Sequence, residues 1–200
     1  MGNVILKVDE KSVVPDGQKR DSVRISSQDS FGFGTLWMLD ALHTPYGCRY
    51  VILGHNNSTL TIDARSVSGA RTGVLGQVFR GQPVIIIDTP VRSMLRAASG
   101  GEIDIFEGVN MQSNNQMALH TGQCTMPVGL PQTGMVTSRD CTSYGGHNSG
   151  CGVMDANTKS YGKPFADSGG GVWVTQFESS GIKIWFVPVS DGTVKPPFVG

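Results

Sequence analysis

The sequence lacks both an excess of charge of one sign and a long apolar run. Lys and Arg together number 16, Asp and Glu also number 16, and only 16% of the 200 residues are charged. Surplus positive charge is typical of proteins that bind nucleic acid or anionic membranes, and a transmembrane helix needs about 20 consecutive apolar residues. We therefore predict neither nucleic acid nor a membrane as a partner. A chain of this length is expected to form one domain.

The cysteines lack a pattern that predicts a metal site. Cys48, Cys124, Cys141 and Cys151 contain no Cys-x-x-Cys pair. A zinc site built from Cys141, His147 and Cys151 would lack the paired ligand spacing that such sites use. An even number of cysteines in a loop-rich chain favours disulfides and an oxidising compartment instead. The sequence predicts no bound metal and leaves all three disulfide pairings open.

The first residues lack a targeting segment. They carry neither the charged region nor the apolar region of a secretory signal peptide, and Leu6 occupies a position at which a myristoylation signal has Ser or Thr. The cysteines nevertheless suit a secreted protein. We therefore expect an extracellular protein whose beginning is absent from this chain.

Helical periodicity is weak, and short strand-like runs recur along the chain. These runs cover residues 4–8, 22–26, 35–39, 102–107, 116–120, 172–177 and 182–187. Turn signals such as Pro15-Asp16-Gly17 separate them, and the chain holds 27 Gly and 10 Pro. Short strands with glycine-rich joints predict an all-β antiparallel sandwich.

One segment, between Arg49 and Ala98, differs in composition from its surroundings. It contains six Arg and no Lys, and after Tyr50 its only aromatic residue is Phe79. Such a shift is compatible with an inserted subdomain or a long loop. It is also compatible with sequence that was never selected to fold, such as a retained intron. We predict a single domain over 1–200 in which 49–98 is an anomalous inserted or mis-translated segment.

Three carboxylates lie close together in the strand-like run at 102–107. On a regular strand Glu102 and Asp104 share one face, whereas Glu107 would turn toward the other face. Burying an unpaired carboxylate is costly, so we predict a β-bulge near Ile105 and Phe106 that returns Glu107 to the acidic face. An exposed edge strand without catalytic role is the alternative interpretation.

The predicted bulge gives the two glutamates a spacing of chemical interest. Their Cα atoms would lie roughly 13 Å apart at about 3.3 Å per strand step. Side chains leaning toward each other would approach the roughly 5 to 5.5 Å that retaining glycoside hydrolysis requires. Three crowded carboxyl groups should also push their pKa values apart, which would leave one ionised nucleophile and one protonated acid.

The run Glu102-Ile-Asp104-Ile-Phe-Glu107 resembles the E-x-D-x-x-E signature of the laminarinase-like branch of glycoside hydrolase family 16. Further runs similar to fungal members of that family lie at 21–27, 45–48, 108–110, 115–121, 170–173 and 182–186. The resemblance implies a concanavalin-like β-jelly-roll sandwich with a glucan cleft. It also implies an endo-acting hydrolase of β-1,3 or mixed β-1,3/1,4-glucans. Glu102 would be the nucleophile, Glu107 the acid/base and Asp104 the helper of Glu102.

The resemblance also suggests substrate contacts, each with a plainer alternative. His120 shares a predicted strand face with Gln116, and the family has a histidine beside its catalytic acids at this position; a structural histidine is the alternative. Arg24 would reach sugar hydroxyls or simply face solvent. Trp173 and Trp185 would stack on sugar rings or pack in the interior. The enzyme would need no cofactor, and we expect a monomer that acts on β-glucan.

The resemblance fails in three places. Family members continue after the run at 45–48 into a Trp-rich strand on the donor side of the cleft, and here the Arg-rich segment stands in its place. The family also has strands before Asn3 and after Gly200, so we expect an incomplete sandwich. Three alternatives to a hydrolase therefore stay open: a noncatalytic glucan-binding sandwich, an inactive fragment, and a transglycosylase on the same scaffold.

Overall fold

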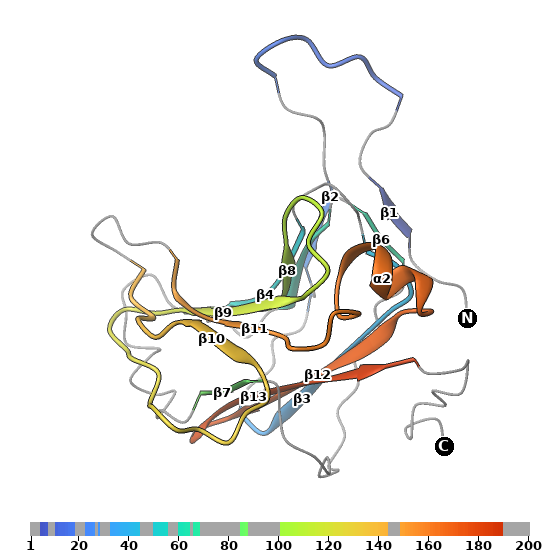
Figure 1. Cartoon of the computed structure of the whole chain (residues 1–200). Helices are drawn as coiled ribbons and strands as arrows, with labels where there is room; N and C mark the ends of the chain where they lie inside the picture. Colours follow the sequence, from blue (N-terminus) through green and yellow to red (C-terminus); the bar gives the residue numbers. More distant parts are fainter. Residues whose placement is uncertain are drawn as a thin grey trace.

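The computed structural model describes residues 5–7, 11–18, 23–26, 28, 33–44, 50–55, 60–64, 66–68, 85–87, 101–143 and 149–189. Within these residues the chain forms thirteen strands and one short helix, α2 (Gly162–Asp167) (Figure 1). Every strand pair in the sheets is antiparallel. The prediction of an all-β antiparallel sandwich is confirmed. In this part of the chain, no helix is long and apolar enough to cross a membrane.

The larger sheet has seven strands. Its order is β10 (Met135–Ser138), β11 (Cys151–Met154), β9 (Gln116–His120), β8 (Glu102–Gly108), β4 (Tyr50–His55), β5 (Leu60–Ala64) and β2 (Val23–Ser26). The acidic strand β8 is therefore the central strand, with three strands on each side. A central strand is held by two neighbours, so its backbone geometry is fixed from both sides.

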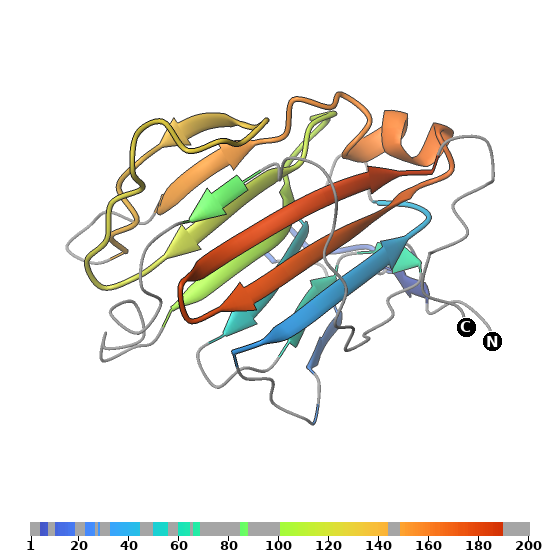
Figure 2. The same cartoon turned by 90° about the horizontal axis from the view of Figure 1, so that it is seen from below.

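A second sheet of four strands packs against the first. Its order is β3 (Thr35–Ala41), β12 (Gly171–Glu178), β13 (Gly181–Pro188) and β7 (Ile85–Ile87). Figure 2 views this sheet with the larger sheet behind it. A two-stranded ribbon joins β1 (Ile5–Lys7) to β6 (Ser66–Ser68). The segment 49–98 thus contributes strands to all three sheets, β4 to β7, and its origin stays a prediction.

Aromatic rings fill the core between the sheets. Phe106, on β8, lies 4.3 Å from Trp173 and 4.8 Å from Tyr161 between ring centroids. Trp173 in turn lies 4.6 Å from Phe186 and 5.0 Å from Phe165. Phe106, Tyr161, Phe165 and Trp173 are fully buried. Packing of Phe106 against these rings therefore anchors β8 to the core. Burial of apolar surface of this kind is the dominant favourable term in folding.

The segment around α2 fixes the far end of β8. The hydroxyl of Tyr161 donates to the carbonyl of Gly108 at 3.3 Å, and the ring of Tyr161 occupies the space that a Cβ at Gly108 would need. The backbone N–H of Tyr161 donates to the carbonyl of Ser113 at 3.0 Å. Glycine at 108 therefore allows Tyr161 to close over the end of the strand.

Candidate active site

Strand β8 carries one more residue than its neighbours between Asp104 and Glu107. Toward β9, Asp104 pairs with Ala118 and Glu107 pairs with Gln116, so three steps on β8 face two on β9. The register toward β4 shifts at the same place. An extra residue seen from both sides is a β-bulge. The bulge predicted near Ile105 and Phe106 is confirmed.

The bulge brings three carboxylates to one face of the sheet. Glu102, Asp104 and Glu107 pair with His120, Ala118 and Gln116 in turn, and these are alternate residues of the regular strand β9. Alternate residues of a strand share a face, and so do directly paired residues. Ile103, Ile105 and Phe106 are buried, whereas Glu102 and Glu107 are only half-buried. One face of β8 is thus acidic and the other belongs to the core.

Asp104 and His120 form the centre of this face. His120 Nε2 lies 2.9 Å from Asp104 Oδ2, and the side chain of Asp104 is only 2% exposed. Burial raises the pKa of Asp104 to about 7, against the lowering effect of its hydrogen bond to His120. The same hydrogen bond raises the pKa of His120. The pair therefore holds a proton at neutral pH more readily than either group would in water.

The two glutamates lie within electrostatic reach of that pair. Glu102 and Glu107 each add to the raised pKa of Asp104 and of His120, because a nearby negative charge favours the protonated form. Possible ligand atoms of Glu102, Asp104 and His120 lie within 4.8 Å of one another. A cation bound there would compete with the His120–Asp104 hydrogen bond. Burial is the first cause of the raised pKa of Asp104 and the two glutamates are smaller ones, so the predicted division into an ionised nucleophile and a protonated acid stays a prediction.

A buried asparagine that sequence analysis missed holds the bulge. Asn115 Oδ1 accepts a hydrogen bond from the backbone N–H of Glu107 at 2.9 Å. Its Nδ2 donates to the carbonyl of Ile105, also at 2.9 Å. The side chain of Gln112 donates to the carbonyl of Glu107 at 3.0 Å. The sequence presents Asn115 only as the first residue of the family-like run 115–121, directly before the strand that pairs with β8, and gives no sign of its role.

Small residues continue this face across β9 and β11. Gly152 pairs with Ala118, which pairs with Asp104. A Cβ at Gly152 would lie 2.5 Å from Thr137 Oγ1 on β10 and 3.7 Å from the amide nitrogen of Gln116. Gly152 is itself buried, and its lack of a side chain lets Thr137 and Gln116 pack close to the sheet beside Asp104.

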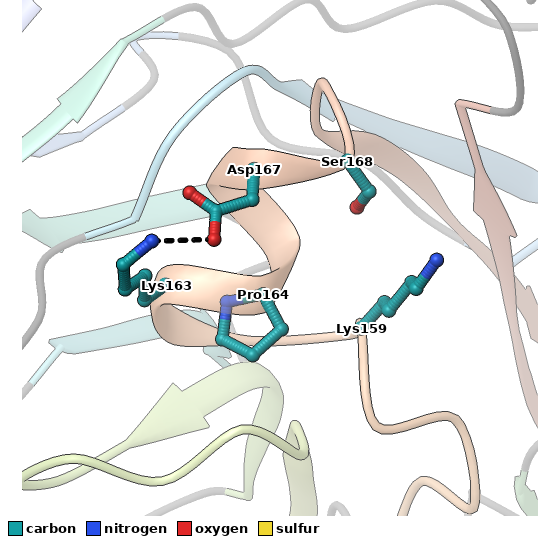
Figure 3. A pocket seen from close by; sticks show the side chains of 5 residues that line it. All are labelled: Lys159, Lys163, Pro164, Asp167 and Ser168. Atoms are coloured by element: carbon teal, nitrogen blue, oxygen red, sulfur yellow. Dashed lines mark hydrogen bonds and ion pairs between the residues drawn. The ribbon is translucent and has the colours of Figure 1, made fainter.

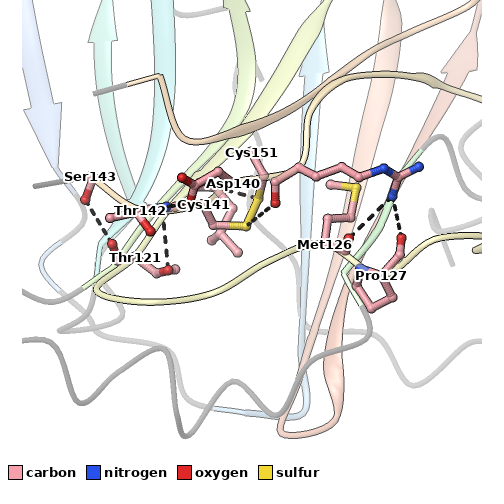
Figure 4. Close-up of a disulfide and its surroundings, with 10 residues drawn as sticks. Thr121, Met126, Pro127, Asp140, Cys141, Thr142, Ser143 and Cys151 are labelled. Carbon is pink, nitrogen blue, oxygen red and sulfur yellow. Dashed lines mark hydrogen bonds between the residues drawn. A yellow bond between two sulfur atoms is a disulfide. The ribbon is translucent and has the colours of Figure 1, made fainter. Parts of the chain in front are cut away.

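A disulfide joins Cys141 to Cys151 on the core side of the sheet (Figure 4). Cys151 pairs with Leu119, the residue before His120. The segment after Cys141 also lies along the end of β9, because the N–H of Thr121 donates to the carbonyl of Cys141 at 2.8 Å. The prediction of disulfides is confirmed, and this one excludes zinc ligation by the two cysteines. Cys48 and His147 lie outside the described residues.

The comparisons with known proteins agree with this geometry. The XgeA-like catalytic GH16 domain family matches residues 1–50 and 94–193 of the chain. The chain belongs to glycoside hydrolase family 16. The predicted resemblance is thereby confirmed, and the match passes over most of the segment 49–98.

Curated relatives of this GH16 domain are fungal. It is 34% identical over 188 residues to a probable glycosidase, C21B10.07, of Schizosaccharomyces pombe, which covers 92% of this chain and 36% of the relative. It is 31% identical over 191 residues to the endo-1,3(4)-beta-glucanase xgeA of Emericella nidulans, which covers 94% of this chain and 24% of that protein. The chain therefore spans between a quarter and about a third of the length of these relatives.

Solved structures share its fold. The GH16 domain superposes on Laminarinase 16A from Phanerochaete chrysosporium, solved with two beta-glucans in donor and acceptor sites. The TM-score is 0.69 at 31% identity, over 96% of this chain and 53% of that one. An elongating GH family 16 beta-1,3-glucosyltransferase gives a TM-score of 0.64 at 31% identity, over 94% and 51% of the two chains. The predicted jelly-roll sandwich is confirmed.

Two predicted substrate contacts of the GH16 domain, both tryptophans, lie away from the carboxylates. Trp173 is fully buried in the core, so its ring is not available to a sugar. Trp185 pairs with Val174 and packs with Leu36 and Val172 on the outer face of the four-stranded sheet. Both tryptophans occupy the packing positions that were the alternative interpretation, and we do not carry them further as substrate contacts.

Arg24 lies in the same sheet as the carboxylates but on its edge strand. It pairs with Asp63 on β5, Asp63 pairs with Val51 on β4, and Val51 pairs with Glu107. Arg24 therefore occupies the cross-strand row of Glu107, three strands away. Its side chain lies outside what the structure describes.

A separate hollow of about 440 Å³ lies beside α2 (Figure 3). It is lined by Lys159, Lys163, Pro164, Asp167 and Ser168, and an ion pair of 2.6 Å joins Lys163 to Asp167. This pair is well exposed, so it contributes little to stability. None of the acidic residues of β8 lines the hollow, and it has no part in the candidate site.

Proposed function

We propose that this GH16 domain is the catalytic core of an endo-acting, retaining β-glucanase of β-1,3 or mixed β-1,3/1,4-glucans. The observation that carries the proposal is the bulge in β8, which sets Glu102, Asp104 and Glu107 on one face of the sheet. Family membership and the fungal glucanase relatives support the same reaction and substrate class.

In the first step Glu102 attacks the anomeric carbon of the bound glucan. A bond forms between a Glu102 oxygen and that carbon, and the glycosidic bond breaks. Glu107 gives its proton to the departing oxygen, so the leaving chain departs as a neutral alcohol. The product of this step is a covalent glycosyl–enzyme.

In the second step water completes the reaction. Glu107, now ionised, takes a proton from the water molecule, whose oxygen attacks the anomeric carbon and releases Glu102. Two inversions at one carbon leave its configuration unchanged, and Glu107 has regained its proton. No cofactor enters this balance.

Asp104 and His120 would tune Glu102 in this scheme. Asp104 Oδ1 is buried and makes no hydrogen bond to the other described residues. With the pKa of Asp104 raised to about 7, this oxygen can carry the proton and donate it toward Glu102. A hydrogen bond of that kind stabilises the ionised nucleophile and the carboxylate that departs in the second step.

Substrate binding would use the polar residues that face the same side. His120 and Gln116 are half-buried and pair with Glu102 and Glu107, so each lies beside one reacting group. We propose that both contact sugar hydroxyls, and that Arg24 contacts the glucan farther along the row of Glu107.

The test is release of reducing sugar from laminarin and from mixed-linkage glucan. We expect activity in the unaltered protein and losses of roughly 10²- to 10⁴-fold in Glu102→Gln and in Glu107→Gln, at unchanged thermal stability. Binding of laminarin without turnover by the unaltered protein would instead identify a noncatalytic glucan-binding sandwich. An unfolded far-ultraviolet circular dichroism spectrum would identify an inactive fragment.

Transfer to a second sugar is the other candidate, because one similar structure is an elongating beta-1,3-glucosyltransferase. The two reactions differ only in whether water or a sugar hydroxyl attacks the glycosyl–enzyme. Mass spectrometry of products from laminari-oligosaccharides separates them. Products longer than the substrate indicate transfer, and shorter products alone indicate hydrolysis.

We propose an extracellular location and a monomeric state for the enzyme. The Cys141–Cys151 disulfide supports the location, because disulfides persist in oxidising compartments. Culture-medium fractionation of the producing organism tests the location. Light scattering on the purified protein tests the monomer, and a mass of twice the chain would overturn it.

A further inference from the structure

We propose that Asn115 is a positioning residue for catalysis, which orients Glu107 by holding the bulge of β8 open. The inference rests on the proposed function of Glu107 as the acid/base. Asn115 is not expected to touch the substrate, because it is fully buried. It acts through the backbone on either side of the extra residue.

The two hydrogen bonds of the Asn115 side chain span the bulge. The carboxamide oxygen accepts from the N–H of Glu107, and the carboxamide nitrogen donates to the carbonyl of Ile105. A bulge interrupts the regular ladder, and the buried backbone groups it displaces must find other partners. The carboxamide of Asn115 is both donor and acceptor, so it can bond the displaced backbone groups on both sides of the extra residue.

Asn115 is itself fixed by its backbone. Its N–H donates to Ser160 Oγ at 2.8 Å, and its carbonyl accepts from the N–H of Asp155 at 2.9 Å. Ser160 Oγ donates in turn to the carbonyl of Asn157 at 2.7 Å. All four polar groups of Asn115 therefore have partners. The two side-chain hydrogen bonds across the bulge, which we call the Asn115 clamp, are thus anchored in the loop that follows β11.

The Asn115 clamp sets the direction in which the side chain of Glu107 projects from β8. The side-chain period of a strand is two, so the extra residue decides whether Glu107 lies on the acidic face of β8 or on its core face. Small displacements of an acid/base are costly, since a shift of about 1 Å can lower a rate about 10²-fold. Loss of the clamp should therefore weaken proton donation more than it weakens nucleophilic attack.

Leaving groups of different quality measure this difference. A laminaribioside of dinitrophenol needs no proton on departure, whereas the phenyl laminaribioside does. The value kcat/KM reports the steps up to formation of the glycosyl–enzyme. The ratio of kcat/KM for the two substrates does not depend on the fraction of folded enzyme, so it stays informative when a variant is partly unfolded.

We expect Asn115→Leu, which is similar in size but cannot hydrogen-bond, to lose at least about tenfold more kcat/KM on the phenyl glycoside than on the dinitrophenyl glycoside. Asn115→Asp keeps the acceptor and should fall between Leu and the unaltered protein. Asn114→Ala is the matched control. Its side chain bonds the carbonyl of Asp155 at 2.8 Å, in the same loop, and it touches neither side of the bulge. This variant should leave the ratio unchanged.

Equal losses on both glycosides in Asn115→Leu would overturn the inference and leave Asn115 with a structural role only. Glu107→Gln separates this result from failure of the proposed function. If Glu107→Gln shows the strong leaving-group dependence and Asn115→Leu does not, only the positioning role fails. If Glu107→Gln also shows none, the assignment of Glu107 as the acid/base fails first.

Discussion

The two ends of β8 are held by different means. At the first end, Glu102 lies in regular register opposite His120, and its neighbours Asp104 and His120 share a proton. At the second end, Glu107 follows a bulge whose backbone is bonded by the side chains of Asn115 and Gln112. One end is organised by titratable side chains and the other by neutral amides.

The difference matches what each proposed role requires. A nucleophile must keep its negative charge, so groups that can lend it a proton are useful beside it. An acid/base must face the leaving oxygen in the first step and the attacking water in the second, so a fixed backbone direction is useful behind it. Changes at the first end should therefore alter pH dependence, and changes at the second end should alter leaving-group dependence.

Among changes that leave both glutamates in place, the largest expected effect comes from breaking the first end alone. Asp104→Leu, which is similar in size but cannot hydrogen-bond, removes the group that donates toward Glu102 and leaves the Asn115 clamp intact. We expect kcat/KM to fall roughly 10²-fold, and to fall equally on the phenyl and dinitrophenyl glycosides. Steady-state kinetics on both substrates checks this. A loss confined to the phenyl glycoside would show that the two ends are not independent.

The pH dependence of stability sharpens the comparison further. The folded pKa of Asp104 rises from 3.8 to about 7, and that of His120 also rises, so the folded state binds more protons than the unfolded state. Stability from this pair is therefore fully present below pH 4 and is lost as pH rises through 7. The contribution of Asp104 is at most about 4 kcal/mol, at about 1.4 kcal/mol per pKa unit.

Thermal melts from pH 4 to pH 8 measure this loss. The double variant Asp104→Asn, His120→Gln should lose less stability across the range than the unaltered protein. Burial also raises the pKa of Asp155, but this group is present in both proteins and cancels in the comparison. Parallel stability curves for the two proteins would contradict the prediction.

Removing the disulfide should have a smaller effect on activity than on stability. The bond closes a loop with a sequence separation of 10, so Cys141→Ser with Cys151→Ser should lose about 2–3 kcal/mol of unfolding free energy. Urea unfolding measures this. Thr142→Ala, in the same loop, is the control and should lose well under that amount. A stability loss of equal size in the control would assign the effect to the loop rather than to the bond.

The smallest expected effect is at Gly152, which pairs with Ala118 beside Asp104. A Cβ in Gly152→Ala would meet the exposed side chain of Thr137, which can move aside. We expect KM for laminari-oligosaccharides to rise a few-fold, by roughly 1 kcal/mol of binding free energy, with kcat unchanged. Initial rates at varied substrate concentration test this. A fall in kcat at constant KM would place Gly152 in the chemistry rather than in binding.

Much of the fold was predictable from alternation and turn signals. The run at 116–120 forms the strand β9 at the predicted residues, and the run at 102–107 forms β8. The strands β10 and β11 were missed; Cys151–Met154 contains a glycine and a single β-branched residue, so its strand signal is weak. The bulge was predictable because the cost of burying Glu107 follows from its chemistry alone.

Other features of the site depend on contacts that the sequence does not reveal. Alternation predicts that Trp185 lies on one face of its strand, but not that this face is the outer face of the opposite sheet. The raised pKa of Asp104 depends on burial, which Glu102 on the same strand escapes in part. The role of Asn115 depends on two backbone groups eight and ten residues away.

The position of Phe106 in the aromatic core has a consequence for how this strand can change. Ile105 and Phe106 are consecutive, and both are buried. Deleting either residue would keep every carboxylate and most of the apolar side chains. It would nevertheless move the side chain of Glu107, and those after it on the strand, to the opposite face of the sheet. The proposed chemistry of this strand therefore depends on the number of residues between Asp104 and Glu107. Loss of a single codon there would abolish it without removing any acidic residue.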